Sequence, residues 1–144
     1  MKRAFIAIIL AALTMGAMAQ KTIASFPGGQ KALTKFLDKN LQYPDAAGDY
    51  GVEGSVIMTF FVEKDGSLSD ISAHDCKIDR FNTTKFSQET ESKQQEVKKQ
   101  FALLFAKEGA RVIRKMPKWV PGKVNGENVR TEINQRITFI DPNK

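Results

Sequence analysis

The stretch of residues 43–70, YPDAAGDYGVEGSVIMTFFVEKDGSLSD, contains the pattern that decides the fold. Its central part, Ser55–Lys64, carries Val56, Met58, Phe60 and Val62 on one face of a strand and the apolar Ile57 and Phe61 on the other. A strand with two apolar faces is typical of a central position in a sheet. Asp65-Gly66 is a hairpin-turn signal, and the segment after it, Leu68–Cys76, predicts a second and more polar strand.

Helical patterns lie on both sides of this hairpin. Apolar residues recur at helical spacing over Gln30–Asn40, and Pro44 ends this helix because the residue before a proline disfavours helical geometry. Pro44 can then start a short helix that runs to Asp49. A longer apolar stripe that ends at Met116 predicts the main packing helix, with Ser87 as a plausible N-cap.

The segment Val129–Ile140 alternates with a period of two, which predicts a strand with one buried and one wet face. The two faces are Val129, Thr131, Ile133, Ile137 and Phe139, and Arg130, Glu132, Asn134, Arg136 and Thr138. The full order is helix, strand, strand, helix, strand. It predicts an α+β fold in which a three-stranded antiparallel sheet packs against helices on one face.

The N-terminus has the layout of a secretory signal peptide. Lys2-Arg3 precedes the apolar run Ala4–Leu13, and Ala17-Met18-Ala19 is a small-x-small cleavage pattern. The apolar run is about half of the roughly 20 residues that span a bilayer. We therefore expect a signal peptide at residues 1–19 and one exported domain at residues 20–144. An uncleaved membrane anchor is the alternative.

Composition and chemistry argue against several functions. The net charge of +6 comes without a nucleic-acid motif or a dense basic run, so we expect no nucleic-acid partner. The single Cys76 excludes an internal disulfide framework. On a strand, His74 and Cys76 would share a face, but no base-orienting group or oxyanion site accompanies them. We expect no enzyme, no cofactor and no metal site.

A set of short motifs, taken together in their order and spacing, resembles the C-terminal domain of TonB. The motifs are Tyr43-Pro44, Ala46-Ala47, Gly51, Gly54, Val56, Phe60, Val62, Asp65-Gly66, Met116-Pro117-Lys118-Trp119 and Pro121-Gly122. The leading Phe26-Pro27-Gly28-Gly29 is similar to a common variant of that family. The resemblance covers about Phe26 to Ile140 and implies a TonB/TolA C-terminal-like fold.

The resemblance implies a binding role in the periplasm. Domains of this family contact TonB-dependent outer-membrane transporters by pairing with an extended segment, the TonB box, beside the domain's last strand. The physical basis is β-augmentation, in which an added strand satisfies the unpaired backbone groups of an edge strand. The residues that match this role are Gln42, Tyr43, Pro44, Val129, Arg130, Thr131, Glu132, Ile133, Asn134, Gln135, Arg136 and Ile137.

The sequence departs from a full TonB in two respects. It lacks a long proline-rich spacer, since only Pro27 precedes Pro44. The polar stretch Lys77–Lys99 is longer than the family's usual strand-to-helix connection, and we expect a loop up to about Phe86 and a helical extension after it.

Three functions remain open. The first is a transporter-binding module. The second is an anchored energy transducer that retains residues 1–19. The third is a self-associating or structural envelope domain, because the open strand edge that binds a transporter could equally pair with a second copy of the chain. The polar strand Leu68–Cys76 is a rival for that edge.

Overall fold

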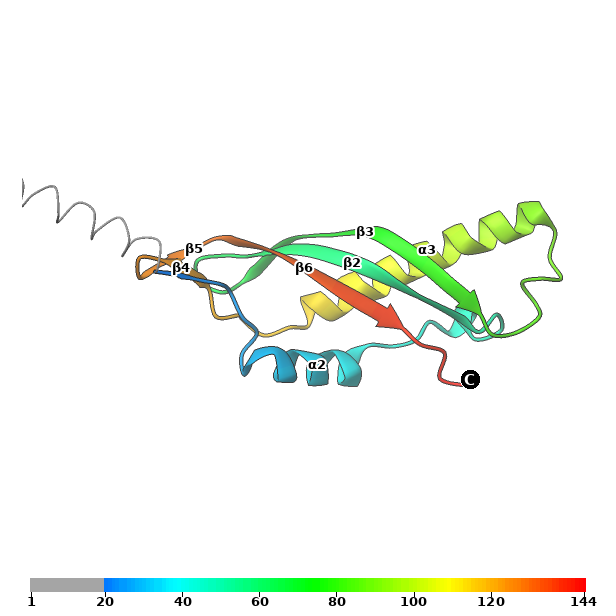
Figure 1. Cartoon of the computed structure of the whole chain (residues 1–144), viewed down its shortest axis with the longest axis horizontal. Coiled ribbons are helices and arrows are strands. Elements are labelled where there is room, and N and C mark those ends of the chain that lie inside the picture. The colour runs from blue at the N-terminus through cyan, green and yellow to red at the C-terminus, as the bar shows by residue number, and fades with distance from the viewer. Residues whose placement is uncertain (1–19) are drawn as a thin grey trace, which may run out of the picture.

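A computed structural model describes residues 20–144, and the predicted signal peptide lies outside these described residues. Figure 1 shows one long helix packed on a sheet, a shorter helix beside it, and a small sheet at one end. The elements are β1 (Lys21–Thr22), α2 (Gly29–Asn40), the 3-10 turn η1 (Asp45–Ala47), β2 (Val52–Val62), β3 (Leu68–Phe81), α3 (Glu91–Arg114), β4 (Gly122–Val124), β5 (Glu127–Val129) and β6 (Thr131–Phe139).

The main sheet has the order β3-β2-β6, and both pairings are antiparallel. The central position predicted for the apolar strand is therefore confirmed, as is the α+β class with a three-stranded antiparallel sheet. One face of β2 is fully buried, with Val56, Met58 and Phe60 all at 0% exposure. α3 packs against β2 and β3 on this face, where Phe105 stacks on Phe139 with ring centroids 4.1 Å apart.

A second small sheet, in the order β1-β4-β5, was not predicted. The predicted single strand Val129–Ile140 is wrong at its start, because Val129 ends β5 and β6 begins at Thr131. The sequence marks the turn between β4 and β5, where Asn125 and Gly126 have φ values of 52° and 81°. The flanking strands have only three residues each, which is too short to show a period.

The loop predicted over residues 77–86 is also wrong in its first half, since β3 continues to Phe81. Phe81 stacks on Phe86 with ring centroids 3.7 Å apart, so the turn after β3 closes over an apolar contact. The cap of α3 is Thr90, whose side chain accepts a 3.2 Å hydrogen bond from the Lys93 N–H. Ser87, the predicted cap, lies in the preceding turn. The polar stretch thus contains a strand end, a turn and the first turns of α3.

The short helix expected after Pro44 is a single 3-10 turn over Asp45–Ala47, with Pro44 as its N-cap rather than its first residue. Trp119 is 6% exposed and packs against Phe26 and Phe60. Within residues 20–144, no helix is long and apolar enough to cross a membrane.

Candidate functional site: a strand edge beside Tyr43

β6 forms one edge of the main sheet. It pairs with β2 in a register without a shift, from Thr131 opposite Val62 to Phe139 opposite Gly54. No other strand among residues 20–144 pairs with its second side. β6 has nine residues, so its open edge is about 30 Å long at about 3.4 Å a residue. Thr131 to Ile137 of the predicted binding strand lie on this edge. Val129 lies on β5 and Arg130 lies between the two strands.

The direction of the backbone groups follows from the two residues that come directly after β2. The Glu63 N–H bonds to the Ser67 carbonyl on the β3 side, whereas the Lys64 carbonyl accepts from the Asn128 side chain on the opposite side. Because these directions alternate along a strand, even-numbered residues of β2 bond to β6.

The register then identifies the open groups of β6. Phe60 lies opposite Ile133, so odd-numbered residues of β6 bond to β2 and even-numbered residues point their N–H and C=O outward. The Arg136 carbonyl accepts a 2.9 Å bond from the Gln135 side chain, which agrees with an outward direction. The groups open to an added strand belong to Glu132, Asn134, Arg136 and Thr138.

The side chains of β6 follow the predicted alternation. Ile137 and Phe139 are each 1% exposed, and Glu132, Asn134 and Arg136 lie on the wet face. Two of the wet-face side chains are tied to β2, since the Thr59 hydroxyl donates to Asn134 at 2.6 Å and Arg136 donates to Ser55 at 3.2 Å. These ties hold the strand in register while its edge stays open.

Arg130 interacts with its own chain. Its guanidinium lies 3.7 Å from the Phe61 ring centroid, 3.0 Å from Glu63 and 2.6 Å from Asp70. Among the predicted binding residues, it is the one whose charge is already matched by carboxylates of the fold.

β3, the rival edge, is irregular. Its pairing with β2 shifts register at three places, and Asp70 and Asp75 adopt positive φ angles of 50° and 51°. Bulges of this kind distort an edge and impede pairing with another strand. β6 is therefore the regular open edge of the sheet.

The structure brings Tyr43 to the end of β6. Tyr43 and Leu41 line a hollow of about 390 Å³ together with Thr138, Phe139 and Ile140. The Tyr43 hydroxyl is 2.6 Å from the Val52 carbonyl, to which it donates. Burial and the carboxylates of Asp141 and Glu53 raise the pKa of Tyr43 to about 12, so the phenol is neutral at physiological pH.

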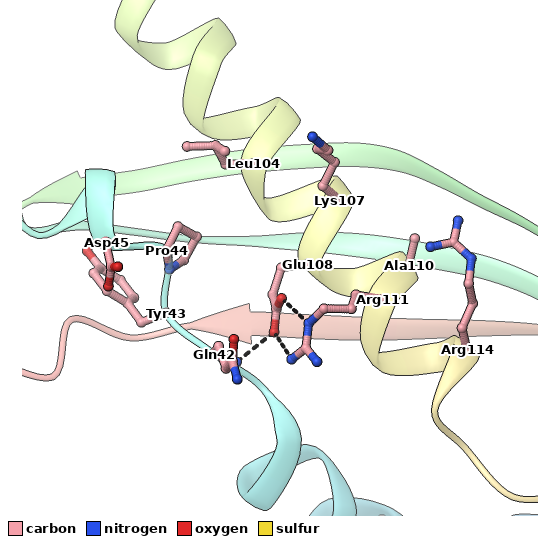
Figure 2. A pocket seen from close by; sticks show the side chains of 10 residues that line it. All are labelled: Gln42, Tyr43, Pro44, Asp45, Leu104, Lys107, Glu108, Ala110, Arg111 and Arg114. Atoms are coloured by element: carbon pink, nitrogen blue, oxygen red, sulfur yellow. Dashed lines mark hydrogen bonds and ion pairs between the residues drawn. The ribbon is translucent and has the colours of Figure 1, made fainter.

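The segment before Tyr43 is fixed to α3. The Gln42 N–H donates to the Glu108 carboxylate at 2.6 Å, and Arg111 donates two hydrogen bonds of 2.7 Å to the same carboxylate (Figure 2). Arg111 also donates to the Asn40 carbonyl at 2.7 Å. The hydrogen bonds to Glu108 keep the pKa of Arg111 above its usual value.

This segment and α3 enclose a second hollow of about 560 Å³, lined by Gln42, Tyr43, Pro44, Asp45, Leu104, Lys107, Glu108, Ala110, Arg111 and Arg114. All three predicted residues of the Gln42–Pro44 segment line it, and Tyr43 also lines the hollow at the end of β6. The contribution of α3 was missed by sequence reasoning. Glu108 and Arg111 look like an ordinary surface pair three residues apart on a helix.

The expectation that His74 and Cys76 share a face is wrong. The register changes from Ile57 opposite His74 to Ser55 opposite Lys77, so β3 carries one extra residue here. His74 consequently lies on the wet face, whereas Cys76 packs against the core, where burial raises the pKa of its thiol. Within residues 20–144, no group of three His, Cys, Asp or Glu side chains is placed to hold a metal ion.

Comparison with known proteins gives no match, whether with family models, with curated proteins or with solved structures. The fold class therefore rests on the structure itself, as two antiparallel three-stranded sheets and two helices. What the β6 edge does must be inferred from its own geometry and from the motifs of the sequence.

Proposed function

We propose that this protein is a periplasmic, TonB-like binding domain that contacts TonB-dependent outer-membrane transporters by strand addition. An extended segment of the transporter pairs with the outer edge of β6. The domain acts by binding and carries out no catalysis, and it needs no cofactor. The order of the long elements, from α2 through β2, β3 and α3 to β6, supports the TonB/TolA C-terminal-like identity.

The observation that carries the proposal is the regular open edge of β6, which ends at the hollow beside Tyr43. An added strand would satisfy backbone groups of Glu132, Asn134, Arg136 and Thr138. Each such hydrogen bond contributes about 0.5–1.5 kcal/mol net. Several of them compensate for the ordering of an extended peptide, and the hollow at the end of the strand can select a side chain.

Self-association is the second candidate, and one feature of β6 favours it. If two copies of β6 pair antiparallel about Asn134, Glu132 of one copy lies opposite Arg136 of the other. Opposite charges directly across an antiparallel pair are favourable, and a twofold axis forms this contact twice. Sedimentation at several protein concentrations separates the two candidates, because self-association through β6 requires a dimer. The variant Arg136→Glu should weaken this dimer. The double variant Glu132→Arg/Arg136→Glu should restore it.

The direct test is an NMR titration of ¹⁵N-labelled residues 20–144 with peptides from the periplasmic N-terminal segments of outer-membrane transporters. We expect the largest shifts over Thr131–Phe139 and near Tyr43. No shift in β6 at millimolar peptide would contradict strand addition. Shifts confined to β3 would place the binding edge on the opposite side of the sheet.

Whether the domain transmits energy depends on residues 1–19. A retained leader would anchor the domain at the inner membrane and support a transducer, whereas cleavage after Ala19 would release a periplasmic adaptor. Mass spectrometry of the protein recovered from the cell envelope gives the N-terminal residue. A mature chain that starts at Gln20 supports the released form that we propose.

A further inference from the structure

The larger hollow extends the binding surface from β6 onto α3. Tyr43 is its shared wall, since the ring lines both this hollow and the smaller one at the end of β6. The walls include the apolar side chains of Pro44, Leu104 and Ala110. A segment that pairs with β6 and passes Tyr43 would therefore come next to α3.

The charges of this hollow are not balanced. Arg111 neutralises Glu108 through two hydrogen bonds, and Glu108 also accepts a hydrogen bond from the Gln42 N–H. Lys107 and Arg114 have no ion pair with any residue from 20 to 144.

The remaining acid among the residues that line this hollow is Asp45. Figure 2 shows Asp45 beside Tyr43 at one end of the hollow and Arg114 at the other. The part of the hollow that lies between Lys107 and Arg114 is therefore basic.

We propose that Lys107 and Arg114 bind acidic side chains of the partner segment, just beyond the stretch that pairs with β6. The inference rests on the proposed strand addition and specifies the chemistry of the same partner. Lys107 and Arg114 lie seven residues apart on α3, or about 10 Å along its axis. Three residues of an extended chain span about the same distance. The segment that fits best carries two carboxylates three residues apart, and an apolar residue that packs near Tyr43 lies between them and the stretch that pairs with β6.

The test uses the transporter peptide that gives the largest shifts in β6 and a twin in which every Asp and Glu is replaced by Asn and Gln. Binding is measured by NMR with residues 20–144, which contain the hydrophobic core that the structure describes. We expect the twin to bind about tenfold more weakly, as estimated for the loss of two exposed ion pairs. We also expect shifts at Lys107 and Arg114 with the acidic peptide only.

The double variant Lys107→Gln/Arg114→Gln should bind the acidic peptide as weakly as the unaltered protein binds the twin. Lys99→Gln/Lys123→Gln is the matched control, because it removes two positive charges at exposed positions outside the hollow.

Equal affinity for the acidic peptide and its twin, with β6 still shifted, would overturn the inference and leave strand addition intact. An equal loss in both double variants would also overturn it, because net charge alone would then explain the effect. Absence of any β6 shift would instead overturn the proposed function, and the inference with it.

Discussion

The Tyr43 hydroxyl donates a 2.6 Å hydrogen bond to the Val52 carbonyl, at the first residue of the central strand. The bond joins the segment that follows α2 to the start of β2. The same ring lines both hollows next to the open edge. Tyr43 thus connects two segments of the fold and also lines the surface that we propose to be the binding site.

Replacement of Tyr43 with Phe should cost about 1–2 kcal/mol in the free energy of unfolding at pH 7, because the Val52 carbonyl loses its donor. Urea denaturation measures this change. Thr34→Ala is the control, because it removes a hydroxyl that donates a hydrogen bond at an exposed helix position. An unchanged midpoint in Tyr43→Phe would show that the bond contributes nothing.

The raised pKa of Tyr43 predicts a loss of stability in alkali. Its folded value of about 12 exceeds the ordinary value of 10.0, so the neutral phenol favours the fold. This contribution is complete below pH 10 and disappears as the pH rises through 12. In Tyr50→Phe, which leaves a single tyrosine, ultraviolet absorbance should report phenolate formation near pH 12. A transition near pH 10 with the fold intact would contradict the packing that we describe.

Glu53 predicts a loss of stability in acid. Burial raises its pKa, but the Asp141 N–H and the Lys144 ammonium outweigh that effect and keep the pKa below its usual value of 4.5. A lowered folded pKa stabilises the fold above pH 4.5, and this contribution is lost as the pH falls through the folded value. Glu53→Gln should be less stable at pH 7 and less sensitive to pH below 4.5. Urea midpoints at several pH values, with Glu127→Gln as an exposed control, test this.

Gly66 should tolerate no side chain. It has a φ of +89°, and a Cβ there would lie 2.3 Å from the Trp119 carbonyl oxygen. Gly66→Ala should cost at least about 2 kcal/mol, from both the left-handed backbone and the clash. Gly126 is the matched control, since its φ is +81° but nothing lies within 4 Å of its Cβ. Gly126→Ala should cost about 1 kcal/mol, and equal effects would contradict the close approach at Gly66.

Proline substitutions separate the edge of β6 from its ladder with β2. Glu132→Pro removes an N–H that points outward, so the protein should fold and its affinity for the transporter peptide should fall about two- to tenfold. Ile133→Pro removes an N–H that bonds to β2 and should unfold or strongly destabilise the domain. Circular dichroism and peptide titration measure the two effects. A folded Glu132→Pro protein with undiminished peptide affinity would contradict pairing at this edge.

The parts of the fold that the sequence predicts are those with a long, regular pattern. The apolar residues on both faces of Ser55–Lys64 indicated the central strand, and the alternation of the last strand indicated one buried face; both are confirmed in the main sheet. β1, β4 and β5 have two or three residues each and cannot show a period. The end of β3 was missed because its stacking partner, Phe86, lies beyond the turn.

The site could be predicted only in part, for a related reason. Strand alternation identified β6 as half-buried, but not which backbone groups point outward, because that depends on its register with β2. The matching of Gln42–Pro44 to a family segment did not indicate that α3 would complete the hollow. Likewise, one extra residue near Asp75 places His74 and Cys76 on opposite faces, and no local pattern marks that bulge.

The most direct measurement of strand addition is a set of intermolecular nuclear Overhauser effects between a bound transporter peptide and β6. We expect contacts between backbone protons of the peptide and those of Glu132, Asn134 and Arg136, repeated every two residues as in a β-ladder. Contacts of this kind with β3 alone, or a bound peptide without any backbone contacts to β6, would contradict the account.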